Sequence, residues 1–353
     1  MFRVVTVDPL NPDREVLRDA AEVLRKGGLV AFPTETVYGL GADAMNPSAV
    51  RKIFEVKRRP PDNPLIVHIC SLNMLFEVVE DVDIDIIEYF KVLWPGPFTA
   101  ILRKKRTVPD ITTAGLPLVA VRMPAHPVAL GLIEELGSPI AAPSANRSGK
   151  PSPTRAEHVI EDLGDSVDLI IDGGETFFGI ESTIVDLTRE PPTLLRPGPI
   201  DPEVLEKILK KKIVIPGFAR GYGEAEKALA PGMKHRHYAP DKGLVLIEYN
   251  ENLDACVEKA VMDLLDRGLK PCLLGYEEFR YVASKFSVEF ISMGSIYRPY
   301  EVAKNLYKGL REVDKTKADL CIALGIYERG IGLAIMNRLR KASGHNIIKC
   351  GGE

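Results

Sequence analysis

The chain has 353 residues, of which 45% are hydrophobic and 27% are charged, and its formal net charge is -3. This composition is typical of an ordinary globular protein long enough for two domains, and it excludes a disordered chain. The small net charge gives no general attraction to nucleic acid or to an anionic membrane, so any anionic ligand must be held by a local group of cations.

The cysteines and the N-terminal segment predict the compartment. The five cysteines are widely scattered and include no CxxC pair. They predict reduced, buried thiols rather than a zinc site or a disulfide framework. The segment 1–16 lacks the apolar core of a signal peptide, and no apolar run approaches the ~20 residues that span a bilayer. We therefore expect a soluble, cytoplasmic protein with no membrane contact.

The first 215 residues alternate helical and strand-like segments. Asn11 as a capping residue and Pro12 at the first helical position predict the start of a helix that ends at Gly27 and Gly28. The next predicted elements are a strand over 29–34, a helix over 47–56 and a strand over 64–70. Further apolar strands alternate with helices up to about residue 205. We expect residues 1–215 to form an α/β domain around an open, twisted sheet of mixed strand directions.

Residues 216–243 differ in kind, because they are rich in Gly, Pro, basic and aromatic residues and show no periodicity. They predict a linker, and long loops of this sort are more often functional than idle, so we consider it a candidate lid. Regular strand–helix alternation follows. It predicts a smaller Rossmann-like domain with a mostly parallel sheet over 244–353. No G-x-G-x-x-G loop follows its first strand, so dinucleotide binding is not indicated.

Cations and small polar residues gather in three segments of the first domain. The basic run 57–59 ends a helix, where it could offset the helix dipole in solvent or clamp a phosphate. The segment 141–154 concentrates serines, an asparagine and a glycine, and its exposed main-chain N–H groups suit an anion, although an ordinary polar turn has the same composition. Arg196, before a Pro-Gly-Pro turn, adds another cation. Together they predict an anion site.

Two polar residues interrupt apolar strands. Arg122 lies among valines and an alanine, where a guanidinium is costly unless an anion meets it; a protein acid and a bound ligand fit equally well. His68 is more simply explained as a hydrogen-bonded core residue. Thr36 and Tyr38 follow a strand end, where open α/β sheets usually bind ligands. These residues predict a site for a nucleotide together with a molecule that carries a carboxylate.

A series of motifs stands in a fixed order along the chain. They read FPTETVYGLGADA, KRRPPDNPLIVHI, LWPGPFTAIL, VAVRMPAHP, PIAAPSANRSGKPSPT, GIESTIVDL and LLRPGPI. In this order they resemble the YrdC-type threonylcarbamoyl-AMP synthases, and the segments 231–240 and 334–343 look like the linker and C-terminal domain of the long, two-domain branch of that family. The resemblance covers nearly the whole chain.

The resemblance implies a nucleotidyltransferase that makes threonylcarbamoyl-AMP and pyrophosphate from L-threonine, bicarbonate and ATP. It implies catalytic roles for Lys57, Arg59, Ser144 and Asn146. It implies ATP binding by Arg59, Asn63, Leu118, Ser144, Ser152, Arg196 and His235. It implies threonine binding by Thr36, His68, Arg122, Ala142 and Ser182. Relatives often carry Thr at position 118 and Tyr at position 235, so the leucine contact would be main-chain and the histidine would cover the pocket less well.

The implied chemistry needs positioning and charge neutralisation more than acid–base residues. Mg²⁺ would arrive with ATP, without protein ligands, and no organic cofactor is expected. The product would pass to the tRNA-threonylcarbamoyl transferase machinery, and a weak tRNA contact stays open. The main alternative is an RNA-binding module that uses the basic cleft without chemistry, which predicts a steep salt dependence. A carbamoyl-transferring enzyme and a pure scaffold protein are weaker alternatives.

Overall fold

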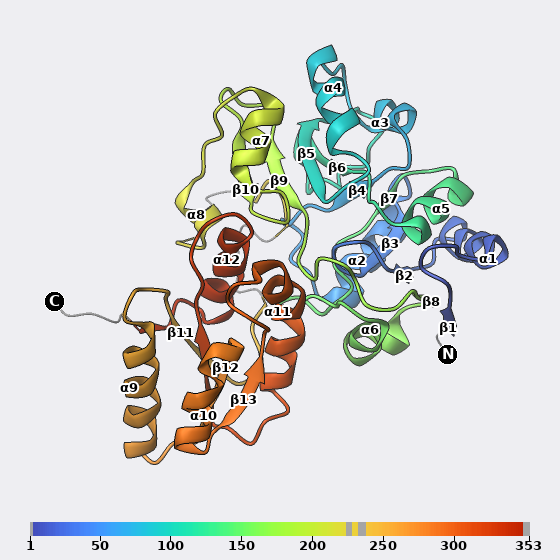
Figure 1. The fold of residues 1–353 in the computed structure, drawn as a ribbon. Coiled ribbons are helices and arrows are strands. Elements are labelled where there is room, and N and C mark those ends of the chain that lie inside the picture. The colour runs from blue at the N-terminus through green and yellow to red at the C-terminus, as the bar shows by residue number, and fades with distance from the viewer. Residues whose placement is uncertain (1–2, 224–227, 232–237, 349–353) are drawn as a thin grey trace. The chain divides into compact units, whose positions relative to one another are not determined.

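The computed structural model describes residues 3–223, 228–231 and 238–348 and divides them into two compact units (Figure 1). The first unit contains the described residues through Ser148, then Ser152–Ala219 and 228–231. The second contains Gly149–Pro151, Arg220–Gly223 and the described residues from 238 onward. Two short segments, 149–151 and 220–223, are thus grouped away from their neighbours in sequence.

The first unit is built on a ten-stranded sheet with the order β1-β8-β2-β3-β7-β4-β6-β5-β9-β10. In chain order the strands are β1 (Arg3–Thr6), β2 (Val30–Phe32), β3 (Gly39–Asp43), β4 (Ile66–His68), β5 (Phe98–Arg103), β6 (Leu118–Arg122), β7 (Ile140–Ala141), β8 (Leu169–Asp172), β9 (Thr183–Asp186) and β10 (Thr193–Arg196). The sheet contains parallel pairs, such as β4 with β6, and antiparallel pairs, such as β5 with β6. The predicted mixed, open sheet is confirmed.

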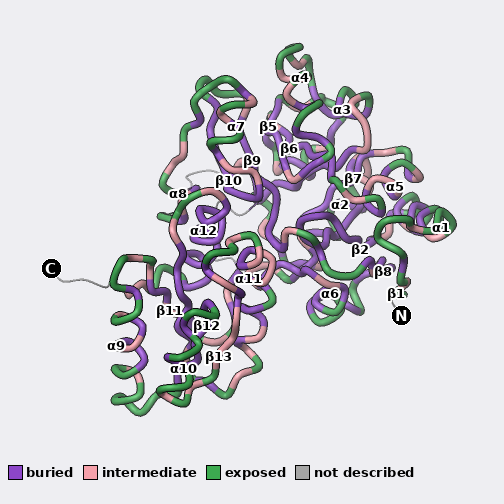
Figure 2. The backbone as a smooth tube through the Cα atoms, in the orientation of Figure 1, coloured by how far each residue is buried: buried purple, intermediate pink, exposed green. Residues whose placement is uncertain are grey.

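Helices α1 to α7 belong to this unit. They are α1 (Arg14–Arg25), α2 (Pro47–Lys57), α3 (Leu72–Val78), α4 (Ile84–Leu93), α5 (Pro127–Leu136), α6 (Ala156–Leu163) and α7 (Pro202–Leu209), with a 3-10 turn η1 (Gly164–Ser166). The short helix α8 (Gly217–Arg220) follows them in the chain. Helices α1 and α5 pack against each other (Figure 1). Most residues of the strands are buried, whereas exposed residues, drawn in green, lie along the helices and loops (Figure 2).

Local chemistry sets the ends of the helices. Asp13, rather than Asn11, caps α1, because its side chain accepts a hydrogen bond from the N–H of Glu15 at 2.8 Å. The predicted helix start was therefore too early. In α2, Asn46 accepts from two N–H groups and Pro47 opens the helix, which ends at Arg58 in a left-handed conformation (φ 52°).

The second unit is built on five strands that are all parallel, in the order β13-β12-β14-β11-β15. They are β11 (Gly243–Ile247), β12 (Pro271–Gly275), β13 (Glu289–Ser292), β14 (Leu320–Leu324) and β15 (Ile347–Ile348). Its helices are α9 (Leu253–Asp266), η2 (Glu277–Phe279), α10 (Arg280–Phe286), α11 (Pro299–Val313) and α12 (Gly332–Ala342). The predicted Rossmann-like parallel sheet is confirmed, although the sequence did not indicate α10 or β15.

Two further expectations bear on the environment of the chain. Cys70, Cys272 and Cys321 are free thiols, as expected for these three positions. Within the described part of the chain, no helix is long and apolar enough to cross a membrane.

Candidate active site

Three polar side chains lie side by side across the middle of the first sheet. Arg122 on β6 pairs with His68 on β4 and with Thr99 on β5. Residues that pair directly across strands point to the same face, so these three form one row, which we call the polar row. All three are buried among apolar strands. Ser182, just before β9, extends the row, because its Oγ lies 2.7 Å from Thr99 Oγ1.

An acidic residue meets the arginine of the polar row. Arg122 Nη2 lies 2.7 Å from Glu35 Oε2, and the two side chains are only 4% and 7% exposed. The geometry is that of an ion pair without a hydrogen bond. Arg122 Nε and Nη2 and both carboxylate oxygens of Glu35 have no hydrogen-bond partner in the described structure. The charge is neutralised, but buried donors of this kind usually hold a partner, which makes this a candidate site for a ligand.

Two histidines beside this pair are neutral. Burial, and then the Arg122 charge, lower the pKa of His68 to about 3. Burial also lowers the pKa of His126 to about 4, although Glu35 opposes the shift. His126 caps α5, since its Nδ1 accepts from the N–H of Val128 at 3.2 Å. The positive charge in this part of the site therefore belongs to Arg122.

Thr36 lies on the loop that also carries Glu35. It is fully buried, and its Oγ1 lies 2.8 Å from Thr34 Oγ1. The Thr34 hydroxyl also accepts from the N–H groups of Thr36 and Val37. The turn is therefore held by its own hydroxyl bonds, which fixes where the Thr36 side chain stands.

Lys57 joins the basic run to the serine-rich loop. Its Nζ donates to the carbonyl of Ser144 at 2.5 Å and also to the carbonyl of Asn146. The side chain is 2% exposed, and burial, followed by the nearby Arg59 charge, lowers the pKa of Lys57 well below its usual range. The Ser144 hydroxyl donates to Asn146 Oδ1 at 2.5 Å, and Asn146 Nδ2 donates to the Arg147 carbonyl. The ammonium group thus shapes the loop through its main chain.

The three cations of the basic run have separate environments. Arg58 is exposed, whereas Arg59 is buried and donates to the carbonyls of Asn63 and Pro64 at 3.0 and 2.9 Å. Asn63 is 1% exposed, and neither atom of its side-chain amide has a hydrogen-bond partner in the described structure. A buried amide with unused donors and an unused acceptor is unusual, and it suits a polar ligand.

Arg196 connects with Ser182 from the neighbouring strand. Its Nε donates to the Ser182 carbonyl at 3.0 Å, and its Nη2 donates to Ser182 Oγ at 3.1 Å. Gly198 lies against the same backbone, since a Cβ there would stand 2.3 Å from the nitrogen of Thr183. Ser152 Oγ donates to Glu181 Oε1 at 2.6 Å. The segment 181–183 therefore carries Ser182 of the expected threonine set and contacts Ser152 and Arg196 of the expected ATP set.

The remaining expected residues are less central. Leu118 is partly buried and packs on an apolar cluster that includes Ala230. The N–H of Ala142 donates to the Ile66 carbonyl at 2.9 Å, so it is already used. His235 lies outside the described residues. The sequence did not single out Glu35, Thr99 or His126, although all three stand inside the quoted motifs.

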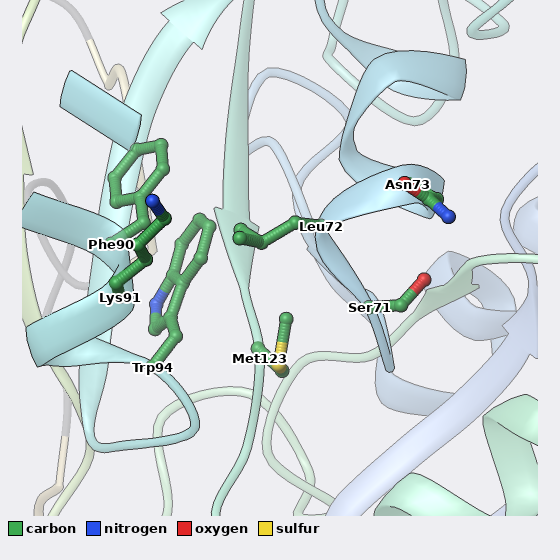
Figure 3. Close-up of a pocket in the computed structure, with 7 residues that line it drawn as sticks. All are labelled: Ser71, Leu72, Asn73, Phe90, Lys91, Trp94 and Met123. Atoms are coloured by element: carbon green, nitrogen blue, oxygen red, sulfur yellow. The ribbon is translucent and has the colours of Figure 1, made fainter. Parts of the chain in front are cut away.

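No three His, Cys, Asp or Glu side chains gather as a metal site within the described residues. A hollow of about 430 Å³ in this unit differs in chemistry from the polar row (Figure 3). It is lined by Ser71, Leu72, Asn73, Phe90, Lys91, Trp94 and Met123. Phe90 and Trp94 stack at 4.0 Å, and Lys91 already pairs with Glu88. This hollow is too apolar to suit a nucleotide.

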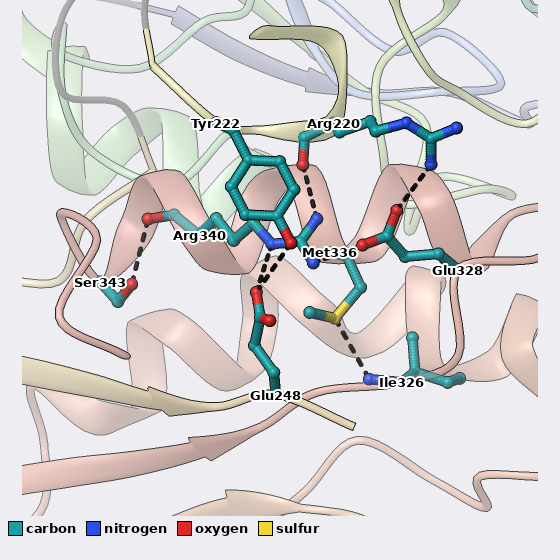
Figure 4. Close-up of polar contacts among 8 residues, drawn as sticks. All are labelled: Arg220, Tyr222, Glu248, Ile326, Glu328, Met336, Arg340 and Ser343. Atoms are coloured by element: carbon teal, nitrogen blue, oxygen red, sulfur yellow. Dashed lines mark hydrogen bonds and ion pairs between the residues drawn. The ribbon is translucent and has the colours of Figure 1, made fainter. Parts of the chain in front are cut away.

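The second unit has a polar cluster of its own (Figure 4). Arg340, on α12, has a side chain that is 2% exposed. It pairs with Glu248 at 2.6 Å and with Glu328, donates to the Arg220 carbonyl at 2.7 Å, and lies 4.1 Å from the centre of the Tyr222 ring. Arg220 also pairs with Glu328 at 3.0 Å. This cluster, which we call the Arg340 cluster, holds residues 220–222 in the second unit.

Two family models match the chain in succession. The first, described as "Telomere recombination", matches residues 22–198. The second, described as "Threonylcarbamoyl-AMP synthase, C-terminal domain", matches residues 200–344. Together they span most of both units.

Curated relatives and a solved structure agree with these matches. The chain is 47% identical to threonylcarbamoyl-AMP synthase of Pyrococcus abyssi over 94% of this chain and 95% of the relative. It is 43% identical to the Bacillus subtilis enzyme over 98% of each. The crystal structure of P. abyssi Sua5 complexed with L-threonine matches with a TM-score of 0.92 and 45% identity, over 99% of this chain and 100% of that one.

Proposed function

Because the chain belongs to the two-domain threonylcarbamoyl-AMP synthases, we propose that the polar row and the loop around Ser144 are the threonine and nucleotide halves of one active site. The activity of the family is a nucleotidyl transfer that serves tRNA threonylcarbamoyladenosine modification. The substrates we assign are L-threonine, bicarbonate and ATP, and the products are L-threonylcarbamoyl-AMP and pyrophosphate.

In the threonine half, Arg122 binds the substrate carboxylate. The observation that supports this role is the ion pair with Glu35, which leaves Arg122 Nε and Nη2 without hydrogen bonds. A carboxylate can accept two parallel bonds from a guanidinium fork. The Ser182 hydroxyl, the neutral ring of His68 and the Thr36 hydroxyl supply the uncharged polar groups for the amine and side-chain hydroxyl. The main chain at Ala142 completes this half.

In the nucleotide half, Lys57, Arg59, Ser144, Asn146, Ser152 and Arg196 hold the phosphates, and Asn63 contributes its amide. The unused amide of Asn63 and the bonds from Lys57 to the loop support this assignment. Lys57 acts by fixing the loop through the carbonyls of Ser144 and Asn146. Leu118 and His235 stay as the weaker members of this half.

The reaction follows from holding the two halves together. The threonine amine combines with bicarbonate, losing water, to give a carbamate. An oxygen of the carbamate attacks the α-phosphorus of ATP, the bond to the bridging oxygen breaks, and pyrophosphate leaves. No side chain must remove a proton in the second step, so positioning and charge account for the rate. We propose that Mg²⁺ enters with the triphosphate and keeps water and phosphate oxygens as ligands.

The linker contributes part of the wall of this site. Arg196 Nη1 donates to the Pro231 carbonyl at 3.5 Å, and Ala230 is buried in the apolar cluster beneath Leu118. These contacts support a lid role for residues 216–243, which would protect the mixed anhydride from water. The transferase machinery that acts on tRNA then consumes the product, and the reaction takes place in the cytoplasm.

The alternative of an RNA-binding module is disfavoured by burial. Lys57, Arg59 and Arg196 are 2%, 9% and 4% exposed. A nucleic-acid backbone needs many accessible cations, which gives binding its steep salt dependence. Buried cations beside small hydroxyl groups suit a single nucleotide.

The function is tested by incubating the protein with ATP, Mg²⁺, bicarbonate and labelled L-threonine and detecting threonylcarbamoyl-AMP by mass spectrometry. Pyrophosphate release that does not depend on threonine would overturn the proposal. Arg122→Ala should raise the KM for threonine at least tenfold more than the KM for ATP, a difference of about 1.4 kcal/mol. The control is Arg103→Ala, because Arg103 is a strand arginine that is exposed. Equal effects on both KM values would remove Arg122 from the threonine half.

A further inference from the structure

The hydroxyl groups of Thr99 and Ser182 share one hydrogen bond, with their oxygens 2.7 Å apart. Both side chains are fully buried, and both belong to the first unit. We call them the hydroxyl pair. Ser182 Oγ also accepts a hydrogen bond from Arg196 Nη2 at 3.1 Å. The place of the pair in the sheet is fixed, because β5 carries Thr99 and runs parallel to β9, which begins at the residue after Ser182.

The hydroxyl pair has one proton more than its own contacts use. Each hydroxyl carries one proton and two lone pairs. The bond between the two oxygens uses one proton, and the bond from Arg196 uses only a lone pair. Among the described residues, neither hydroxyl has a further acceptor within hydrogen-bond distance. One donor is therefore left over in a buried place, where such donors usually hold a partner.

The charge of Arg196 determines which hydroxyl keeps this proton. A hydroxyl that accepts a hydrogen bond from a cation becomes a better donor, because hydrogen bonds in a chain polarise one another. The guanidinium is held in place by a second bond, from its Nε to the Ser182 carbonyl at 3.0 Å. The favoured chain therefore runs from Arg196 through Ser182 to Thr99, and the proton left over is that of Thr99.

Thr99 stands directly beside Arg122. The two residues pair across β5 and β6, so their side chains leave the same face of the sheet, with Cβ atoms about 5 Å apart. Two nitrogens of Arg122, Nε and Nη2, have no hydrogen bonds in the described structure. A carboxylate has two oxygens that each accept hydrogen bonds, so it can take bonds from both side chains. An ammonium group has only donors and cannot take up the proton of Thr99.

We propose that Thr99 binds L-threonine by donating its hydroxyl proton to the substrate carboxylate that Arg122 holds. This role deepens the proposed function and rests on its assignment of the carboxylate to Arg122. Arg196 and Ser182 act behind Thr99, because they turn its proton toward the substrate. The guanidinium supplies the charge, whereas the hydroxyl on the neighbouring strand sets the direction in which the carboxylate lies.

The test uses the full-length enzyme with Thr99→Val, which keeps the shape of the side chain but removes the hydroxyl. The KM for threonine should rise about tenfold, as expected for the loss of one hydrogen bond to a charged group. The KM for ATP should change less than twofold, because Arg196 keeps its bonds to Ser182. Thr99→Ser keeps a hydroxyl and should recover most of the loss. Thr316→Val is the control, because it removes a hydroxyl that donates to the Val313 carbonyl at 2.8 Å in the second unit.

A substrate analogue separates the carboxylate of threonine from its side-chain hydroxyl. L-2-Aminobutyrate has the same carboxylate without the hydroxyl, and its affinity can be measured as competitive inhibition. Thr99→Val should weaken L-2-aminobutyrate by the same factor as threonine. A loss for threonine alone would place Thr99 against the substrate hydroxyl and overturn the assignment to the carboxylate.

Calorimetry of threonine binding separates this inference from the proposed function. Thr99→Val should bind threonine about tenfold more weakly whether or not turnover is observed. Unchanged threonine binding in a folded variant, or equal losses for threonine and ATP, would overturn the role of Thr99. If Thr99→Val does not fold, Thr99→Ala, which removes the same hydroxyl, is measured in the same way. Wild-type protein that binds threonine and ATP but makes no threonylcarbamoyl-AMP would contradict the proposed function alone.

Discussion

Arg122 and Glu35 form a buried ion pair, with Nη2 and Oε2 2.7 Å apart, in which neither atom makes a hydrogen bond within the described structure. The pair supplies charge compensation without directional bonding. An incoming carboxylate could therefore use the donors of Arg122 while Glu35 stays close by. The relationship gives Glu35 a part in the site that can be tested apart from catalysis.

Replacing Glu35 by Gln should lower the free energy of unfolding by about 3 kcal/mol, because a buried charge loses its partner. Threonine should then stabilise the variant more than it stabilises the wild type, since its carboxylate restores the missing negative charge. Urea unfolding with and without threonine measures both effects. The control is Glu277→Gln, in an exposed pair with Arg280, which should change little. A threonine effect equal to that of the wild type would contradict this account.

The stability of the first unit should depend on pH through His68. Its pKa is lowered from 6.5 to about 3 in the folded protein, so below pH 6.5 the unfolded chain binds a proton that the folded chain refuses. The free energy of unfolding must then fall as the pH falls from 6.5 toward 3. His68→Gln should reduce this slope by up to about one proton, or 1.36 kcal/mol per pH unit. The exposed His345→Gln serves as the comparison, and equal slopes in the two variants would refute the prediction.

Gly198→Ala should disturb both substrate sites. An added Cβ would stand 2.3 Å from the Thr183 nitrogen and 2.6 Å from the Ser182 carbonyl carbon, which are backbone atoms and cannot turn aside. Overpacking of this kind costs about 1–3 kcal/mol. Since Ser182 contacts both Thr99 and Arg196, the KM values for threonine and ATP should both rise.

Steady-state kinetics and urea unfolding measure these two effects of Gly198→Ala. The matched variant is Gly243→Ala, because its Cβ would meet only the flexible end of Leu320. It should behave like the wild type. A rise in only one of the two KM values in Gly198→Ala would show that Ser182 does not join the two halves.

Arg340→Met should destabilise the second unit by about 3 kcal/mol, because it leaves Glu248 without its buried partner. Glu328 still pairs with Arg220 in this variant. The share of the lost stability that comes from Glu328 should therefore be smaller at high salt. Chemical denaturation at low and high salt measures both. Arg280→Met, which removes one exposed pair, should change the midpoint little. A midpoint for Arg340→Met equal to that of Arg280→Met would show that the Arg340 cluster adds no stability.

The sequence predicted the elements of the fold well where hydrophobic periodicity was strong. The helix over 47–56 ends one residue later than expected, and the strand–helix alternation of the second unit appears as predicted. The start of α1 was misplaced because Asn11 and Asp13 are both good caps, and only the bond from Asp13 to the N–H of Glu15 distinguishes them. Two short elements, α10 and β15, carry too few residues to show a period.

The composition of the site was easier to predict than its contacts. The cost of a strand arginine indicated that Arg122 needs an anion, but only the folded chain brings Glu35 to it. Likewise, the run from Lys57 to Arg59 was ambiguous between a helix end and a phosphate clamp. The structure shows different environments for its members: Lys57 bonds to the loop, Arg58 is exposed and Arg59 bonds to the turn after it. Contacts between segments far apart in sequence leave no local pattern.

The burial of Ala230 beside Ile66, Ile101 and Ala120 determines where a truncated form of the protein should end. A fragment that stops at residue 215 keeps the ten strands but loses the short segment that covers this apolar patch. Such a fragment would expose this apolar patch and would therefore self-associate when it is concentrated, even though its sheet is complete. A fragment that continues through residue 231 keeps the segment that covers the patch. A truncated first unit should therefore end well beyond its last strand.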